Sequence, residues 1–93
     1  MYRLWGKIMK KNEIKKDHVF EIDNPTLSKE EKLKQGLEAL AYEFDIQIPM
    51  WLSDNEKDFG TLSKSRFYDN HFIETIDFDY FEIEVIEEDK PTY

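Results

Sequence analysis

Two histidines, His18 and His71, are the side chains best suited to acid–base chemistry near neutral pH, because the unperturbed pKa of imidazole lies closest to neutrality. Nucleophilic catalysis would need a second group, but the 93-residue chain has no cysteine and no Gly-x-Ser-x-Gly sequence. A histidine without a nucleophile or an orienting partner more often has a structural role. We therefore expect His18 to cover the gap opposite Gly6 and His71 to make local hydrogen bonds.

The carboxylates near His71 are the second candidate for chemistry. Asp69, Asp77 and Asp79 could join His71 around a metal ion. The same residues are the only candidates for a hydrolase active site. The spacing matches neither a calcium-binding loop nor a two-histidine zinc helix. Among 21 acidic residues some carboxylates come close by chance, and three glycines leave no Gly-rich phosphate loop. The sequence therefore predicts no enzyme, no metal site and no cofactor.

The charges are divided between the two ends of the chain. Residues 1–16 contain six basic side chains and one acid, whereas residues 69–89 contain nine acids and neither Lys nor Arg. Either the two ends bind separate partners, or they are neighbours in one sheet. We favour the second interpretation, in which Glu82 and Glu84 share a face with Arg3 and Lys7 and form cross-strand ion pairs.

Three strands are predicted. Tyr2–Met9 and Ile14–Ile22 should form a hairpin closed by a three-residue loop at 11–13, in which Asn12 tolerates a positive φ. The expected register sets Lys10 against Ile14, Leu4 against Phe20, Tyr2 against Ile22, Arg3 against Glu21, Lys7 against Asp17 and Trp5 against Val19. In the third strand, Phe78–Glu87, apolar residues alternate with Glu82 and Glu84, as in a half-buried strand.

One long helix is predicted at Lys29–Phe44, with Ser28 as N-cap and Glu31 at the third helical position. Its apolar stripe is Leu33, Leu37, Leu40, Ala41 and Phe44. A second capping pattern at Ser53–Glu56 predicts one or two further turns, ended by Gly60. Residues 46–52 are expected to form an edge strand or a packed loop because of Pro49, and residues 61–65 a loop. Periodicity leaves helix and strand open for residues 71–76.

These elements predict an α+β fold: an antiparallel sheet of three or more strands with one main helix packed across one face. The chain is expected to be a single small globular domain over residues 1–93, with 90–93 frayed. The expected core is Leu4, Phe20, Leu33, Leu37, Leu40, Phe44, Phe81 and Ile83. Since the sequence shows no cysteine, no signal peptide and no long apolar stretch, we expect a cytoplasmic protein that does not bind membranes.

Trp5 is the candidate residue for a protein interface. It lies on the charged outer face of the predicted hairpin between Arg3 and Lys7, and exposed tryptophans are enriched at interface hot spots. The interpretation that we favour is that its ring only packs on Val19 across the strands, because aromatic residues often pair in this way. Direct nucleic-acid binding is not expected, because the basic and aromatic stretch at 64–68 has two cations in a chain of net charge −8.

The chain resembles a family of short, functionally uncharacterised bacterial proteins. The resemblance depends on Tyr2–Gly6, on Arg66–Phe67 and on Ile76–Tyr80, and it implies no activity, ligand or catalytic residue. By elimination we expect a small acidic binding or accessory module that recognises a protein partner, with a homodimer as one version. The alternative is a nucleic-acid mimic that inhibits a DNA-binding protein. Trp5, Glu82 and Glu84 are the candidate interface residues in these two cases.

Overall fold

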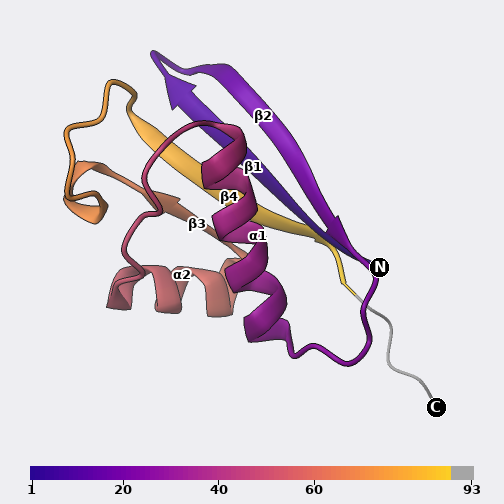
Figure 1. The fold of residues 1–93 in the computed structure, drawn as a ribbon. Coiled ribbons are helices and arrows are strands. Elements are labelled where there is room, and N and C mark those ends of the chain that lie inside the picture. Colours follow the sequence, from indigo (N-terminus) through magenta and orange to yellow (C-terminus); the bar gives the residue numbers. More distant parts are fainter. Residues whose placement is uncertain (89–93) are drawn as a thin grey trace.

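A four-stranded antiparallel sheet is the frame of the protein (Figure 1). The structure is a computed structural model that describes residues 1–88. The strands lie in the order β2-β1-β4-β3, so the first and last strands of the chain are neighbours. Their bounds are β1 Tyr2–Lys10, β2 Glu13–Ile22, β3 Lys64–Phe67 and β4 Tyr80–Glu87. The predicted α+β class is confirmed, and β3 is a fourth strand that periodicity missed.

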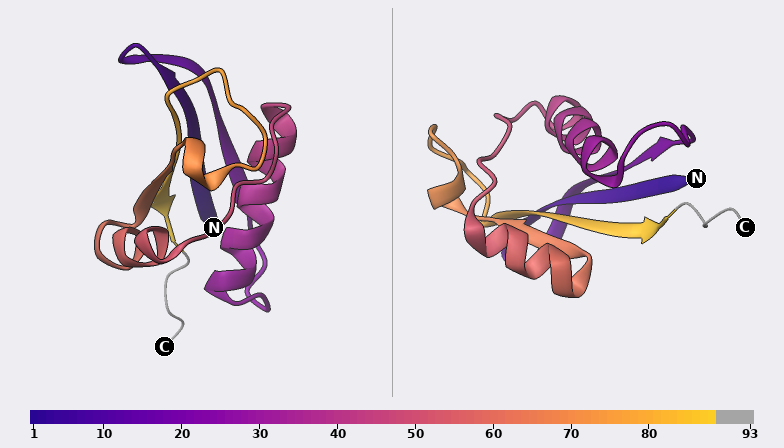
Figure 2. Two further views of the ribbon diagram at one scale, coloured as in Figure 1. Left: turned by 90° about the vertical axis from the view of Figure 1, so that its left-hand side faces the viewer. Right: turned by 90° about the horizontal axis from the view of Figure 1, so that it is seen from below.

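Two helices accompany the sheet, α1 (Lys29–Glu43) and α2 (Ser53–Leu62), with one turn of 3₁₀ helix, η1 (Asp69–His71). Helix α1 lies over β1 and β2, whereas α2 lies beside β3 at the edge of the sheet (Figures 1 and 2). The prediction of one main helix across one face is therefore incomplete. The close approach of α1 to the sheet depends on Gly36, since a Cβ at this position would lie 2.7 Å from Leu4 Cδ2 and 3.0 Å from Phe20 Cδ2.

The hairpin has the predicted register along most of its length, but its end differs. Lys11 and Asn12 both have positive φ, 53° and 63°, and form a two-residue turn of the I′ kind that suits the twist of a hairpin. Met9, rather than Lys10, is opposite Ile14, and a bulge follows between Ile8 and Met9. The shorter loop and the extra residue of the bulge compensate each other. Leu4 is therefore still opposite Phe20, and Lys7 is opposite Asp17.

The core lies between the sheet and the helices. Six of the eight predicted core residues are buried, namely Leu4, Leu37, Leu40, Phe44, Phe81 and Ile83, with Phe67 and Phe72 in addition. Phe20 and Leu33 are only partly buried. Phe20 lies on the edge strand β2, and Leu33 lines an open groove beside α1.

Helix α1 begins as predicted, because the Ser28 side chain accepts a hydrogen bond from Glu31 N at 3.1 Å. The second helix is longer than predicted and is capped differently. Its N-cap is Leu52, and the Asn55 side chain accepts from Leu52 N at 2.9 Å. Gly60 lies inside the helix, which ends at Ser63 in the left-handed region with φ 55°. Interior glycine costs a helix only about 1 kcal/mol, which α2 tolerates.

The remaining segments resolve the open alternatives. Residues 46–52 are irregular rather than an edge strand, and Lys64 and Ser65 belong to β3 rather than to a loop. His71 ends η1, and residues 72–79 are irregular, so 71–76 is neither the start of β4 nor a full helix. The predicted frayed end, 90–93, lies outside the described residues. Within residues 1–88 no helix is long and apolar enough to cross a membrane.

Candidate functional site

The outer face of the sheet contains the three predicted interface residues. Trp5 is opposite Val19 on β2 and opposite Glu84 on β4. It is half-buried, its Nε1 donates to Asp17 Oδ2 at 3.1 Å, and Lys7 Nζ lies 3.9 Å from its ring centroid. Trp5 therefore has both an internal hydrogen-bond partner and a cation over its ring.

Glu82 is the centre of an ion-pair network on the same face. It is only 6 % exposed, and its two oxygens lie 2.9 Å from Lys7 Nζ and 3.1 Å from Arg66 Nε. Burial opposes its ionisation and is the largest single influence on its pKa. The hydrogen bonds and charges of Lys7 and Arg66 together outweigh burial, so the pKa of Glu82 is lower than its usual value.

Two further acids of this face, Glu84 and Glu87, lie near basic side chains. Glu84 is half-buried and lies 3.9 Å from Lys7 Nζ, and Arg3 Nε lies 2.8 Å from Glu87. The structure thus brings Trp5, Glu82 and Glu84 onto one face, as predicted, but uses them in contacts within the sheet. The polarised charges at the two ends of the chain meet across β1 and β4.

His71 is buried and hydrogen-bonded to neighbouring segments of the chain. It is 1 % exposed, and its Nδ1 accepts a hydrogen bond from Tyr68 N at 2.9 Å. Because Nδ1 is an acceptor, the neutral ring carries its proton on Nε2, which then donates to Asp54 Oδ2 at 3.1 Å. The main-chain oxygen of His71 also accepts from Met50 N at 2.7 Å. His71 therefore joins the 46–52 segment, α2 and η1.

The other candidates for chemistry are dispersed. His18 is exposed, and the space at Gly6 is occupied by Leu40 and Phe81, so its predicted covering role is wrong. Asp79 accepts a hydrogen bond from Lys11 N at 2.8 Å, at the turn of the hairpin. Over residues 1–88 no three His, Asp or Glu side chains are grouped as metal ligands would be.

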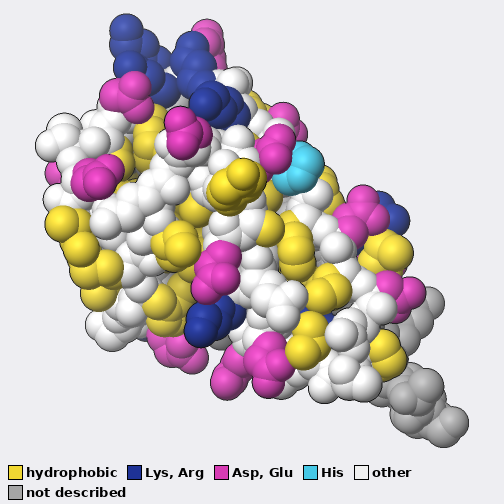
Figure 3. All heavy atoms as spheres, viewed as in Figure 1, with side chains coloured by type: hydrophobic (Ala, Val, Ile, Leu, Met, Phe, Trp, Pro, Cys, Tyr) yellow, Lys and Arg dark blue, Asp and Glu magenta, His cyan; other side chains and the backbone are white. Residues whose placement is uncertain are grey.

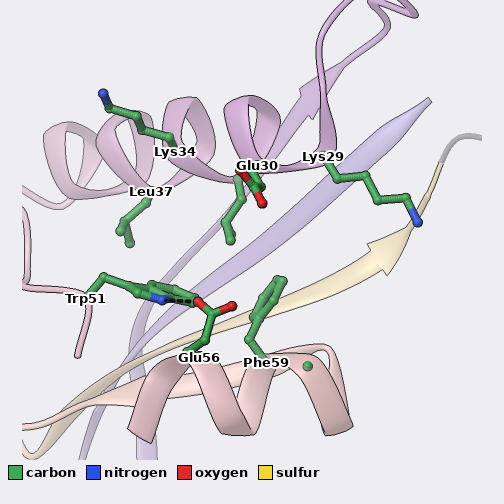
Figure 4. A pocket seen from close by; sticks show the side chains of 9 residues that line it. Lys29, Glu30, Lys34, Leu37, Trp51, Glu56 and Phe59 are labelled. Atoms are coloured by element: carbon green, nitrogen blue, oxygen red, sulfur yellow. Dashed lines mark hydrogen bonds between the residues drawn. The ribbon is translucent and has the colours of Figure 1, made fainter. Parts of the chain in front are cut away.

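A groove lies between α1 and α2. Its volume is about 410 Å³. Apolar side chains from both sides form its walls: Leu33 and Leu37 from α1, Trp51 from the preceding segment, and Phe59 from α2. Figure 4 shows Leu37 pointing from α1 toward Trp51 on the opposite wall. Its size and apolar lining are those of a binding site.

The aromatic wall of the groove is held by specific contacts. Trp51 meets Phe59 edge to face, with ring centroids 5.6 Å apart, and lies 6.0 Å from Phe67. Trp51 Nε1 donates to Glu56 Oε2 at 2.8 Å (Figure 4). Both Trp51 and Phe59 remain only partly buried, so their rings present apolar surface to the groove.

Asn55 fixes α2 to the sheet behind this wall. It is fully buried, and its Nδ2 donates to Ser65 Oγ at 2.8 Å and to Arg66 O at 3.1 Å. The same side chain caps α2 through Leu52 N. One amide group therefore determines where α2 begins and how it meets β3.

A second hollow, of about 430 Å³, lies near the turn of the hairpin. Lys10, Lys15 and Lys16 line it, and Figure 3 shows basic side chains gathered at this end of the molecule. Asp45 and Asp77 line it too, and Lys15 pairs with Glu13 at 2.8 Å. The carboxylates offset the lysines, so this hollow has no strong preference for an anion.

Comparison with protein-family models, with curated proteins and with solved structures found no match to this chain. The resemblance drawn from the sequence therefore stays a prediction.

Sequence reasoning missed the α1/α2 groove. Leu33 and Leu37 were assigned to the core stripe, and Trp51 lay in a segment without periodicity. The one available signal was Phe59 on the predicted short helix, eight residues after Trp51. That spacing alone does not show that α2 stands away from α1 and leaves space between them.

Proposed function

We propose that the protein is a non-enzymatic binding module that recognises a protein partner through the α1/α2 groove. The observation that carries the proposal is an apolar groove of about 410 Å³, walled by Leu33, Leu37, Trp51 and Phe59. Partly exposed aromatic rings at the centre of a concave surface are the usual anchors of protein interfaces. A cytoplasmic location and the absence of enzymatic activity remain parts of this proposal.

The groove replaces the outer face of the sheet as the proposed interface. Trp5 and Glu82 already have partners within the sheet, so a protein that bound there would have to break those contacts. The same pairing disfavours the nucleic-acid mimic, because Lys7 and Arg66 neutralise Glu82. On the opposite face, which carries α1 and is shown in Figure 3, the acidic side chains are dispersed among neutral and hydrophobic ones.

A matched pair of leucine variants tests the proposal. Leu33→Ser removes apolar surface from the groove, whereas Leu62→Ser changes an exposed leucine, 57 % accessible, that does not line it. Proteins captured from a cell lysate by the wild type should be retained by Leu62→Ser and reduced at least about 10-fold by Leu33→Ser. Equal capture by both variants would show that the groove is not the interface.

Light scattering on the same three proteins tests whether the partner is a second copy of the chain. If the partner is a second copy, the wild type and Leu62→Ser should form a dimer at micromolar concentration. Leu33→Ser should then be the 11.3 kDa monomer. Circular dichroism and urea unfolding of each variant verify that the fold is intact.

A further inference from the structure

We propose that the segment received by the α1/α2 groove is basic and amphipathic, with one or two large apolar side chains in the groove and Lys or Arg beside Glu30 and Glu56. This inference rests on the proposed function and names the chemistry of the partner. It depends on the direction of the charged side chains around the groove, which is independent of the apolar lining.

The two acids of the rim face the groove. Figure 4 shows the Glu30 carboxylate on the side of α1 that faces α2, and Glu56 beside Trp51 on the opposite wall. Glu56 uses Oε2 for the indole of Trp51, a neutral donor. Among residues 1–88 neither Glu30 nor Glu56 forms an ion pair. Both carboxylates are therefore available to a cation that enters with a partner.

The two lysines of the rim are directed elsewhere. Lys29 extends toward the end of β4, where its Nζ lies 3.5 Å from Glu88, and Lys34 points its ammonium group away from the groove (Figure 4). Their aliphatic stems still line the rim. This arrangement leaves negative charge next to the apolar surface. A segment with cations next to its apolar side chains complements both.

The charge of the whole chain acts in the same direction. With a net charge of −8, the protein attracts a basic segment before contact and repels an acidic one. Local and global charge therefore favour the same partner. Because such attraction is screened within about 8–10 Å at physiological salt, binding should weaken as salt is added.

The volume limits what can enter. About 410 Å³ lies near the lower end of the range for ligand pockets, roughly 300–1,000 Å³. That space suits a few anchoring side chains better than a whole helix. The charged residues of the partner would then stay at the rim beside Glu30 and Glu56, where they keep part of their hydration.

Three synthetic peptides test the inference on the full chain. All three are amphipathic helix-forming peptides of 14 residues. Each has the same apolar anchors, Leu and Phe, at positions i and i+4. The flanking residues are Lys in one, Glu in the second and Gln in the third. The protein contains Trp5→Phe, so Trp51 is the one fluorescent indole and reports on the groove. The Lys peptide should change Trp51 fluorescence at a concentration at least about 10-fold lower than the Glu peptide, as charge complementarity requires.

Charge variants then locate the effect. Glu30→Gln and Glu56→Gln should each weaken the Lys peptide about 3- to 10-fold, the range for partly exposed ion pairs. Glu38→Gln, an exposed acid of α1 outside the groove, is the matched control and should change affinity less than about 2-fold. Raising NaCl from 50 to 300 mM should reduce the difference between the Lys and Gln peptides.

The outcomes separate this inference from the proposed function. If the Glu or Gln peptide perturbs Trp51 as strongly as the Lys peptide, the groove binds segments but the proposed charge is wrong. If the Lys peptide binds and Glu38→Gln weakens it as much as Glu30→Gln, the attraction is general and the rim carboxylates do not define the site. If no peptide perturbs Trp51, both this inference and the proposed groove function are wrong.

Discussion

Trp5 on the outer face of the sheet and Trp51 in the α1/α2 groove have similar hydrogen bonds and different surroundings. Each indole donates to a carboxylate, Trp5 to Asp17 at 3.1 Å and Trp51 to Glu56 at 2.8 Å. Lys7 lies over the Trp5 ring and also pairs with Glu82. Glu56 has no such cation among residues 1–88, and Trp51 borders an open volume.

Neighbouring cations decide whether an aromatic and acidic surface is closed or open to a partner. On the outer face, Lys7 and Arg66 come from strands next to the acids and satisfy them within the sheet. In the groove, the rim lysines Lys29 and Lys34 point away and the acids face the open volume. An aromatic residue beside acids is therefore a poor guide to an interface until the positions of the lysines are known.

The largest expected effect is a loss of stability when the contacts that join α2 to β3 are removed. Asn55→Ala removes the buried amide that caps α2 and joins it to β3, leaving Ser65 Oγ and Arg66 O without this donor. We expect the free energy of unfolding to fall by about 3 kcal/mol, since buried polar groups left unpaired cost about 1–3 kcal/mol each. Urea unfolding measures the change, and Asn70→Ala, at an exposed position, is the control. A loss below about 1 kcal/mol would contradict the role of Asn55.

Glu82→Gln should have the next largest effect, on the closed outer face. It removes the carboxylate shared by Lys7 and Arg66, and Lys7 is only 12 % exposed in its side chain. Removing one partner of a buried pair costs about 3–5 kcal/mol. We expect about 2 kcal/mol at pH 7, because the Arg66 side chain is 47 % exposed and can regain water.

The pH dependence of this loss has a definite sign. Because the pKa of Glu82 is lowered in the folded state, its ion pairs stabilise the protein fully above its unfolded pKa, near 4.5. That contribution is lost as pH falls through the lower folded value. Urea unfolding of the wild type and of Glu82→Gln should therefore differ most at neutral pH and converge at acidic pH. A difference that grows on acidification would contradict the assignment.

Trp5→Ala should have a smaller effect on stability and none on the groove. The half-buried ring loses its packing, its hydrogen bond to Asp17 and its contact with Lys7, so we expect a cost of about 1–2 kcal/mol in urea unfolding. The affinity for the Lys peptide, measured by heteronuclear NMR of the groove residues, should be unchanged. If Trp5→Ala abolishes that binding while the fold persists, the outer face is part of the interface after all.

Glu84→Gln should have the smallest effect. Glu84 is half-exposed and lies 3.9 Å from Lys7, which has a shorter contact with Glu82. Such a pair contributes about 0.5 kcal/mol or less, and 1 M NaCl should remove its contribution. Compared under identical conditions with Glu82→Gln, this variant measures how unequal two acids on one strand face can be. Equal losses would contradict the central place of Glu82.

The sheet was more predictable than the site. Alternation in β1, β2 and β4 and the opposite charges at the two ends of the chain predicted that Lys7 and Glu82 would share a face, which the structure confirms. The groove could not be predicted in this way. It depends on where α2 stands, and that is decided by Asn55 and by the contacts of His71 with Met50 and Asp54, which join segments distant in sequence.

Local sequence patterns suffice to predict which residues share a strand face, where α1 begins, and how the charges of β1 and β4 meet. These properties follow from periods of two and 3.6 residues and from local capping, so neighbours along the chain suffice to define them. Three properties depend instead on how the elements pack: Leu33 borders open space, Glu82 is buried, and the rim lysines Lys29 and Lys34 point away from the groove and leave its acids exposed. The burial and the charge of a site depend on all the elements that pack around it, and a local sequence pattern does not contain that information.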